Sequence, residues 1–145
     1  MTTKFSALVQ IRKNAVKNAE QKLIAVNQRI AVAQMDLASA QQQLSEIVIP
    51  QKGSYNDLLY FQQIKESYLN EVDRIVEFIA SLRLERKVIQ EEMRLLNIEY
   101  EKANYLDSLE KTKILKERQY KEAAQLDEVS ILLHNARHNP QGGSL

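Results

Sequence analysis

Apolar residues recur along the first third of the chain at alternating spacings of four and three positions. The pattern runs for six heptads without a slip, and twelve of its thirteen positions are apolar, with Arg12 as the exception. Such a repeat keeps one stripe of a helix facing a partner helix, as in a coiled coil. The positions of this first seam are Phe5, Val9, Arg12, Val16, Ala19, Leu23, Val26, Ile30, Ala33, Leu37, Ala40, Leu44 and Ile47.

The same repeat begins again after a break and continues past the middle of the chain. Twelve of its fourteen positions are apolar, and the exceptions are Lys65 and Arg86. A second striped helix is therefore predicted. The positions of this second seam are Leu58, Phe61, Lys65, Tyr68, Val72, Ile75, Ile79, Leu82, Arg86, Ile89, Met93, Leu96, Tyr100 and Ala103.

The break between the seams holds Pro50 and Gly53, the only proline and the only glycine before residue 140. A proline lacks the N–H that a helix interior needs and restricts the residue before it, so the first helix is expected to end near Val48. Glycine tolerates a positive φ where a chain reverses. The sequence thus predicts a turn over residues 49–55.

Two striped helices joined by a short turn bury their seams by folding back on each other. We therefore predict an all-α protein, an antiparallel two-helix coiled-coil hairpin with a longer second helix. The first helix is expected at about 4–48 and the second at about 56–138. Ser54 or Asn56 is expected to cap the second helix.

The two predicted arms differ in length, and this fixes where their pairing should end. A turn centred near residues 51–52 places Phe5 opposite residues 98–100, and the second seam loses its regularity just beyond Ala103. Residues 104–138 are then a solvated lone helix or a helix that a partner stabilises, and both alternatives remain open. We expect one domain over residues 1–138, followed by a flexible tail at 139–145.

A second apolar face lies two positions on from the second seam, about 200° around the helix. Near the open end of the hairpin it changes from polar to apolar. It is either the edge of a wide helix–helix interface or a docking face for another protein or for the terminal segment of this chain. Its residues are Leu84, Val88, Leu95 and Ile98.

Composition narrows the class of protein further. Cysteine is absent, which excludes disulfides, thiolate metal sites and a cysteine nucleophile. No apolar run approaches the roughly 20 residues that cross a bilayer, so a soluble protein without direct membrane insertion is expected. Residues 1–30 carry six basic and one acidic residue, but residues 31–100 are net acidic and offer a partner within the chain. We therefore expect no nucleic-acid binding.

Residues with catalytic chemistry are few. The glycine-rich motifs that cradle phosphates are missing, and a two-helix hairpin offers no concave pocket in which a pKa would shift. His134 and His138 are spaced i, i+4, so one helix face presents both, but two ligands do not make a metal site. We expect no cofactor, no metal and no enzymatic activity.

Three segments, taken in order, resemble the FliJ family, the small coiled-coil component of the flagellar type III export apparatus. They are "KFSALVQIRKNAVKNAEQKL" at 4–23, "YFQQIKESYLNEVDRIV" at 60–76 and "ERQYKEAAQLDEVS" at 117–130. A fourth stretch, "NIEYEKANYLDSLEKTK" at 97–113, is similar to the version found in epsilonproteobacterial members.

The resemblance implies a stalk-like cytoplasmic protein, peripherally associated with the inner membrane at the flagellar base. Its implied partners are the hexameric export ATPase, the cytoplasmic linker of the export gate membrane protein and export chaperones. The family contacts the gate through an apolar pair after an aromatic-Gln-Gln stretch, which corresponds here to Ile64 and Tyr68, preceded by Phe61. The family usually carries Phe and Leu at the pair.

Ile64 lies off the second seam and is expected to face outward, whereas Tyr68 lies on the seam and also serves intrachain packing. The leading hypothesis is a non-enzymatic component that links the export ATPase ring to the export gate and assists chaperone handling. The alternative is a coiled-coil scaffold or stalk of another assembly, such as a virulence-type secretion system. An enzyme would require the "HNARH" segment to bind a metal.

Overall fold

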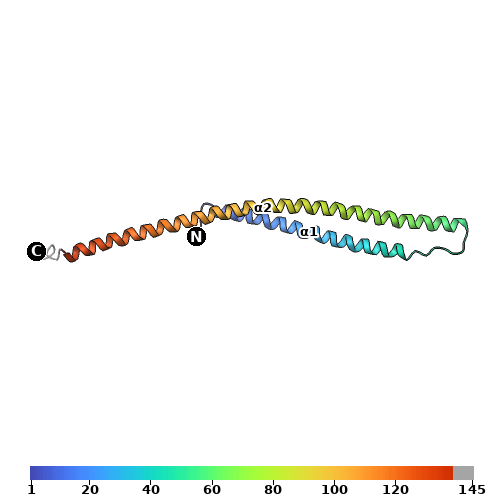
Figure 1. Cartoon of the computed structure of the whole chain (residues 1–145), viewed down its shortest axis with the longest axis horizontal. Coiled ribbons are helices and arrows are strands. Elements are labelled where there is room, and N and C mark those ends of the chain that lie inside the picture. The colour runs from blue at the N-terminus through green and yellow to red at the C-terminus, as the bar shows by residue number, and fades with distance from the viewer. Residues whose placement is uncertain (139–145) are drawn as a thin grey trace. The chain divides into compact units, whose positions relative to one another are not determined.

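The computed structural model describes residues 1–138, which form two helices. Helix α1 spans Ser6–Ser45 with 40 residues, and α2 spans Tyr55–His138 with 84 residues (Figure 1). The all-α prediction is confirmed, because the two helices pack against each other as a helical hairpin whose second helix is longer. The flexible tail expected at residues 139–145 lies outside the described residues.

Contacts divide the chain into two units. The central unit comprises Lys13–Ile98, and the terminal unit combines Met1–Arg12 with the part of α2 that begins at Glu99. Each helix runs through both units without a break.

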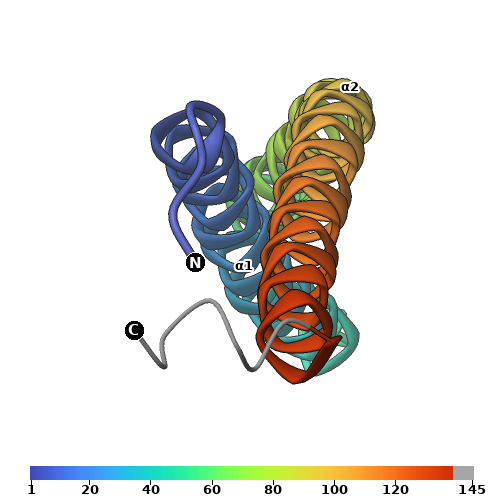
Figure 2. The ribbon, with the colours of Figure 1, turned by 90° about the vertical axis from the view of Figure 1, so that its left-hand side faces the viewer.

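The core of the central unit is a single line of aliphatic side chains between α1 and α2, which lie side by side (Figures 1 and 2). The main cluster takes four buried residues from each helix, and all of them occupy seam positions. Val16 and Ala19 of α1 are also buried. Leu82 is 1% exposed and Val26 is 2% exposed, so the centre of the seam is shielded from solvent. The eight residues are Val26, Ile30, Ala33 and Ala40 from α1 and Ile75, Ile79, Leu82 and Ile89 from α2.

Burial follows the predicted seams closely. All thirteen positions of the first seam are buried or partly buried, and so are twelve of the fourteen in the second. The two exceptions are Leu58 and Lys65, at the start of α2. A heptad stripe on each helix therefore accounts for the interface.

Helix α1 ends earlier than its sequence suggested, at Ser45 rather than near Val48. The Ser45 hydroxyl donates to the Gln42 carbonyl oxygen at 2.7 Å, a local bond that competes with helix continuation. The three residues before Pro50 are Ile47, Val48 and Ile49, whose branched side chains favour extended backbone. The loop between the helices thus comprises residues 46–54.

Ion pairs across the hairpin define its register. Lys22 Nζ lies 3.6 Å from Glu92 Oε1, and Arg29 Nη1 lies 3.1 Å from Glu85 Oε1. The expected turn centred near residues 51–52 put Arg29 opposite residue 74, so that prediction was wrong by roughly three helical turns.

The loop explains the error in register. Its residues Ile47, Val48 and Pro50 lie beside the first turns of α2, so the loop runs along the helix before it reverses. An extended residue advances about 3.3 Å, against 1.5 Å in a helix. A nine-residue extended loop therefore carries the start of α2 well beyond the end of α1.

The terminal unit begins with a cap on α1. The Thr3 hydroxyl oxygen accepts from the Phe5 N–H at 3.1 Å, while the Ser6 hydroxyl oxygen accepts from the Thr3 N–H at 2.9 Å. The same Thr3 hydroxyl donates to Asp107 Oδ1 on α2. This reciprocal arrangement satisfies amide groups that the first turn of a helix leaves free.

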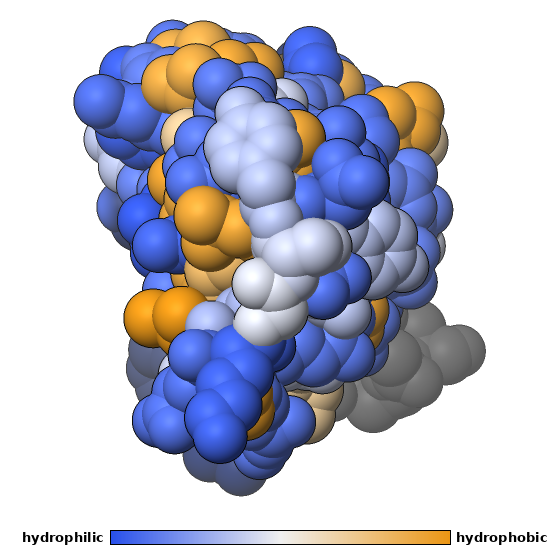
Figure 3. Space-filling model, turned by 90° about the vertical axis from the view of Figure 1, so that its right-hand side faces the viewer, coloured by the Kyte–Doolittle hydropathy of each residue, from blue (hydrophilic) through white to orange (hydrophobic). Residues whose placement is uncertain are grey.

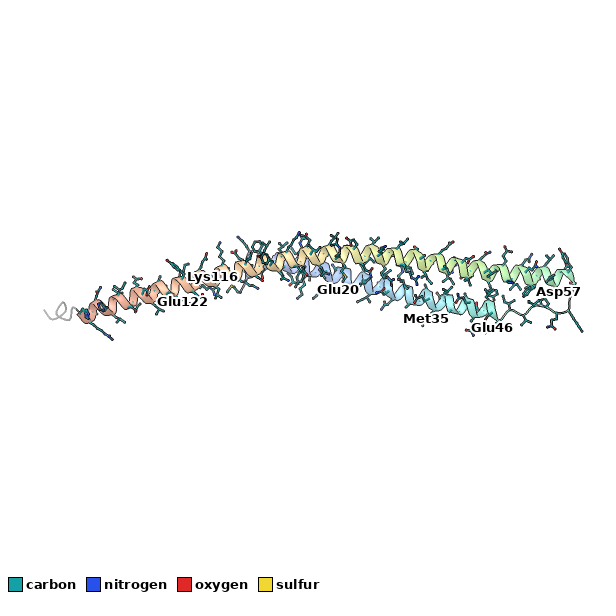
Figure 4. All side chains as sticks on the ribbon, viewed as in Figure 1. Glu20, Met35, Glu46, Asp57, Lys116 and Glu122 are labelled. Carbon is teal, nitrogen blue, oxygen red and sulfur yellow. The ribbon has the colours of Figure 1, made fainter. Side chains whose placement is uncertain are left out.

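Packing in the terminal unit extends past Ala103, where the sequence predicted that pairing would end. Asp107 is buried, Glu110 and Ile114 are partly buried, and Lys4 Nζ lies 4.0 Å from Glu110 Oε2. The seam continues there through polar residues, which hydropathy alone does not reveal. Beyond Ile114, α2 stays helical to His138 with every side chain exposed, including Lys116 and Glu122 (Figure 4).

Candidate partner-binding surface

The end of the hairpin where the chain reverses presents exposed apolar side chains from both the loop and α2. We call it the tip, and it consists of loop residues 46–54 with the first turns of α2 up to Tyr68. Figure 4 marks Glu46 at the start of the loop and Asp57 in the first turn of α2. Figure 3 looks onto this end and shows hydrophobic side chains interspersed among hydrophilic ones.

A capping box holds the start of α2 in place. The Ser54 N–H donates to Asp57 Oδ2 at 3.0 Å, and the Asp57 N–H lies 3.4 Å from the Ser54 hydroxyl oxygen. Of the two residues proposed to cap this helix, Ser54 is the one that does so. Asp57 also places a negative charge at the N-terminus of α2, where the helix dipole favours it.

Gly53 makes this capping geometry possible. A Cβ built on Gly53 would lie only 2.7 Å from Asp57 Oδ2, the carboxylate oxygen that accepts the capping hydrogen bond. Any larger residue would therefore displace the cap. The requirement for glycine here comes from this close approach and from a φ of 159°, which L side chains rarely adopt.

A groove of about 310 Å³ runs between the loop and α2 at the tip. Its walls are mostly apolar, and Asp57 provides its charged group. Val48 is 82% exposed and Tyr60 is 67% exposed, so the rim of the groove consists of apolar and aromatic groups that solvent reaches. The lining residues are Ile47, Val48, Pro50, Asp57, Tyr60, Phe61 and Ile64.

The three residues assigned to the gate contact lie in or next to this groove. Phe61 and Ile64 line it, and Tyr68 is partly buried one turn further along α2. Ile64 was expected to face outward, away from intrachain packing, but it is partly buried beside Ile47 and Val48. The offset loop is the cause, because it covers a face of α2 that a tight turn would leave open.

The loop contributes apolar surface that seam analysis missed. Val48 and Ile49 are largely exposed, and so is Tyr55, the first residue of α2. A signal was present in the sequence, since connections between helices are usually polar, and three consecutive branched apolar residues before Pro50 are unusual there.

The second apolar face is partly as expected. Leu84, Val88 and Leu95 are exposed, whereas Ile98 is partly buried. A further groove of about 400 Å³ on the central unit was not anticipated. It is lined by Ala25, Gln28, Arg29, Val32 and Phe78.

Four ion pairs join charged side chains of the central unit, two across the hairpin and two along α2. Arg74 Nη2 donates to Glu71 Oε1 at 2.6 Å, and Arg94 Nη2 donates to Glu91 Oε1 at 2.7 Å. These hydrogen bonds lower the pKa of Glu71 and of Glu91. Both pairs are exposed, so they contribute little to stability.

Among residues 1–138, no cluster of three or more histidine, cysteine, aspartate or glutamate side chains is placed to hold a metal ion. The rings of His134 and His138 lie 4.1 Å apart, centroid to centroid, on the exposed end of α2. In the same described range, no helix is long and apolar enough to cross a membrane.

The chain was compared with protein families, curated proteins and solved structures. The family model of the flagellar FliJ protein matches residues 1–139. No curated protein and no solved structure matches the chain. The family match spans both helices and the loop between them.

Proposed function

Because this chain belongs to the flagellar FliJ family, whose model matches residues 1–139, we propose that it links the export ATPase to the export gate. The family is a non-enzymatic component of flagellar type III protein export. The proposal adds specific partners, namely the hexameric export ATPase, the cytoplasmic linker of the gate membrane protein and export chaperones. It places the chain in the cytoplasm, against the inner membrane at the flagellar base.

The tip supports the assignment of the gate linker as one partner. A groove with apolar walls and an exposed aromatic rim suits an extended or helical peptide segment, since such segments bind by placing a few apolar anchors into pockets. Phe61 and Ile64 contribute to its floor, and the loop supplies Val48 at the rim. The family match is the observation that carries the proposal, and the groove supports the tip as the place of the contact.

The length of α2 supports a second partner at the other end of the chain. Residues 115–138 are helical, and their side chains are exposed. Helices that lack a packed face usually gain one from a partner. We assign this segment to the export ATPase.

The test of the gate assignment is a titration of the purified gate linker against the full chain. Val48→Asp places a charge at the rim of the groove on a side chain that is mostly exposed, so the fold should tolerate it. Affinity for the linker should fall at least about tenfold, since a desolvated charge costs well over the 1.4 kcal/mol that this represents.

Met35→Asp is the matched control, because Met35 is 72% exposed on α1 and lies outside the groove (Figure 4). It should bind the linker as the unchanged chain does. Val88→Asp examines the second apolar face in the same assay. Loss of linker affinity in Val88→Asp with full affinity in Val48→Asp would move the contact from the tip to that face.

A further inference from the structure

The seams of α1 and α2 fit each other in more than one register. Both follow the same alternation of four and three, so sliding one helix by a heptad brings seam residues opposite seam residues again. Lys22 and Arg29 are seven residues apart, and so are their partners Glu92 and Glu85. The slide therefore replaces the Lys22–Glu92 pair by Lys22 opposite Glu85.

The alternative register has advantages that the observed one lacks. A slide that tightens the turn brings Phe5 from the neighbourhood of Asp107 to that of Tyr100, so an apolar residue meets an aromatic one. Arg86, which now approaches Asn27 Oδ1 at 3.4 Å, comes near Glu20. The loop also runs about 10 Å less far along α2.

One feature of the terminal unit opposes the slide. Asp107 is the only buried charged residue among residues 1–138, and it occupies the position that follows Ala103 in the second seam. It accepts from the Thr3 hydroxyl, and its other carboxylate oxygen lies 3.0 Å from Lys111 Nζ. Thr3 at the same time caps α1 by accepting from the Phe5 N–H. A slide breaks the bond between the two helices.

From these contacts we propose that the Thr3–Asp107 pair, the clasp, selects one of two hairpin registers that lie one heptad apart. A buried polar pair at a single seam position is a known way to fix the register of helices whose apolar stripes are permissive. The clasp closes only in the observed register, since the slide moves Asp107 about 10 Å away from Thr3 along the helix.

The choice of register has consequences at both ends. A heptad corresponds to about 10 Å along a helix. In the tighter register α2 would extend that much further beyond the start of α1, and the loop would contact a different part of α2. The clasp therefore maintains the observed lining of the tip groove.

Engineered cysteines report the register directly, because the chain has none of its own. In the full-length chain, Lys22→Cys with Glu92→Cys reports the observed register, and Lys22→Cys with Glu85→Cys reports the slid one. The two reporters are matched, because each replaces Lys22 and one glutamate, and the two glutamates lie seven residues apart on the same face of α2. A short thiol cross-linker, applied to dilute monomer, measures how often each pair meets.

With the clasp intact, only the first reporter should cross-link. Asp107→Ala removes the acceptor, and cross-linking of the slid reporter should rise at least about tenfold while the first declines, since hydrogen bonds to a charged group reach this size. Thr3→Val, which keeps the shape of the side chain and removes the hydroxyl, should act in the same direction. Asp127→Ala removes an exposed aspartate from the same helix and should change neither reporter.

Background cross-linking of the slid reporter in both clasp variants, with helical circular dichroism unchanged, would show that the rest of the hairpin sets the register and would overturn the proposal. Loss of helical signal in both variants would overturn it as well, because the clasp would then serve folding itself. If cross-linking of the slid reporter rises equally in Asp127→Ala, the effect comes from the change in net charge, and the proposal is wrong.

Discussion

The central and terminal units use the same two helices in different ways. In the central unit, ten buried aliphatic residues lie along the interface, and charges remain at its edges as exposed ion pairs. In the terminal unit, the buried residues are Ala103 and Asp107, and the hydrogen bond from Thr3 to Asp107 joins the two helices. Apolar burial stabilises the first unit, whereas directional bonds distinguish one alignment of the second from another.

The difference follows from how each kind of contact depends on position. Burial of aliphatic side chains is non-directional and scales with area, so a repeating seam is nearly indifferent to a shift by one repeat. A hydrogen bond between a hydroxyl and a carboxylate is lost when either group moves by a few ångströms. The repeating apolar seam of the central unit therefore provides most of the stability of the hairpin. The hydrogen bond in the terminal unit distinguishes one register from another.

The largest effect is expected from a charge in the central seam. Leu82→Asp places a carboxylate where the side chain is 1% exposed, and burying an unpaired charge costs several kcal/mol, a large share of the roughly 5–15 kcal/mol that stabilises a domain. The hairpin should lose its cooperative thermal transition in circular dichroism. Leu84→Asp, two residues along and 67% exposed, should melt like the unchanged chain. Equal losses in the two variants would contradict the assignment of the seam.

The sequence predicted the central unit better than the tip or the terminal unit, for a physical reason. Seam residues such as Leu82 and Val26 are identified by hydropathy and spacing, and burial follows from both. The register is not contained in that pattern, because it depends on how far the loop extends and on the Thr3–Asp107 bond. A pattern of apolar residues ends where a seam position holds a carboxylate. Because Asp107 occupies the position after Ala103, the sequence predicted that pairing would stop at Ala103.

The same reasoning applies to the candidate site. Phe61, Ile64 and Tyr68 were chosen from a family resemblance, and the structure places the first two in the tip groove. The loop wall of that groove was not foreseen, because Val48 was expected at the end of the first helix, whereas α1 ends at Ser45 and Val48 belongs to the loop. A partner-binding role for these residues stays a prediction until the linker titration is done.

A smaller loss is expected when the clasp loses its hydroxyl. Thr3→Ala removes both the cap of α1 and the donor to Asp107, and loss of an N-cap costs about 1 kcal/mol. The free energy of unfolding should fall by that amount. In chemical unfolding this lowers the midpoint and leaves the slope m of the transition unchanged. Thr2→Ala is the control, since Thr2 is exposed and precedes the cap. A larger loss of stability in Thr2→Ala than in Thr3→Ala would mean that Thr3 is not the cap of α1.

Acid should weaken the terminal unit through Asp107. The hydrogen bond from Thr3, with that from Lys111, lowers the pKa of Asp107, and the nearby N-terminal ammonium adds to the effect. A carboxylate whose pKa is lowered on folding stabilises the protein above its unfolded pKa of about 3.9, and that contribution is lost as the pH falls through the folded pKa. Thermal midpoints should therefore decline more steeply below about pH 4 in the unchanged chain than in Asp107→Asn. Parallel declines would mean that Asp107 has the same pKa in both states.

The smallest effect is expected from removing the exposed end of α2. In a chain that ends at Ile114, every residue with a buried or partly buried side chain remains, so stability should change by less than about 0.5 kcal/mol. Helical circular dichroism should fall by about a fifth, in proportion to the helical residues removed. A chain that ends at Lys102 is the comparison, because it also lacks Ala103 and Asp107 and should melt earlier. If the chain ending at Ile114 melts as early as the one ending at Lys102, residues 115–138 support the paired helices, and the contrast between a packed and an unpartnered part of α2 is wrong.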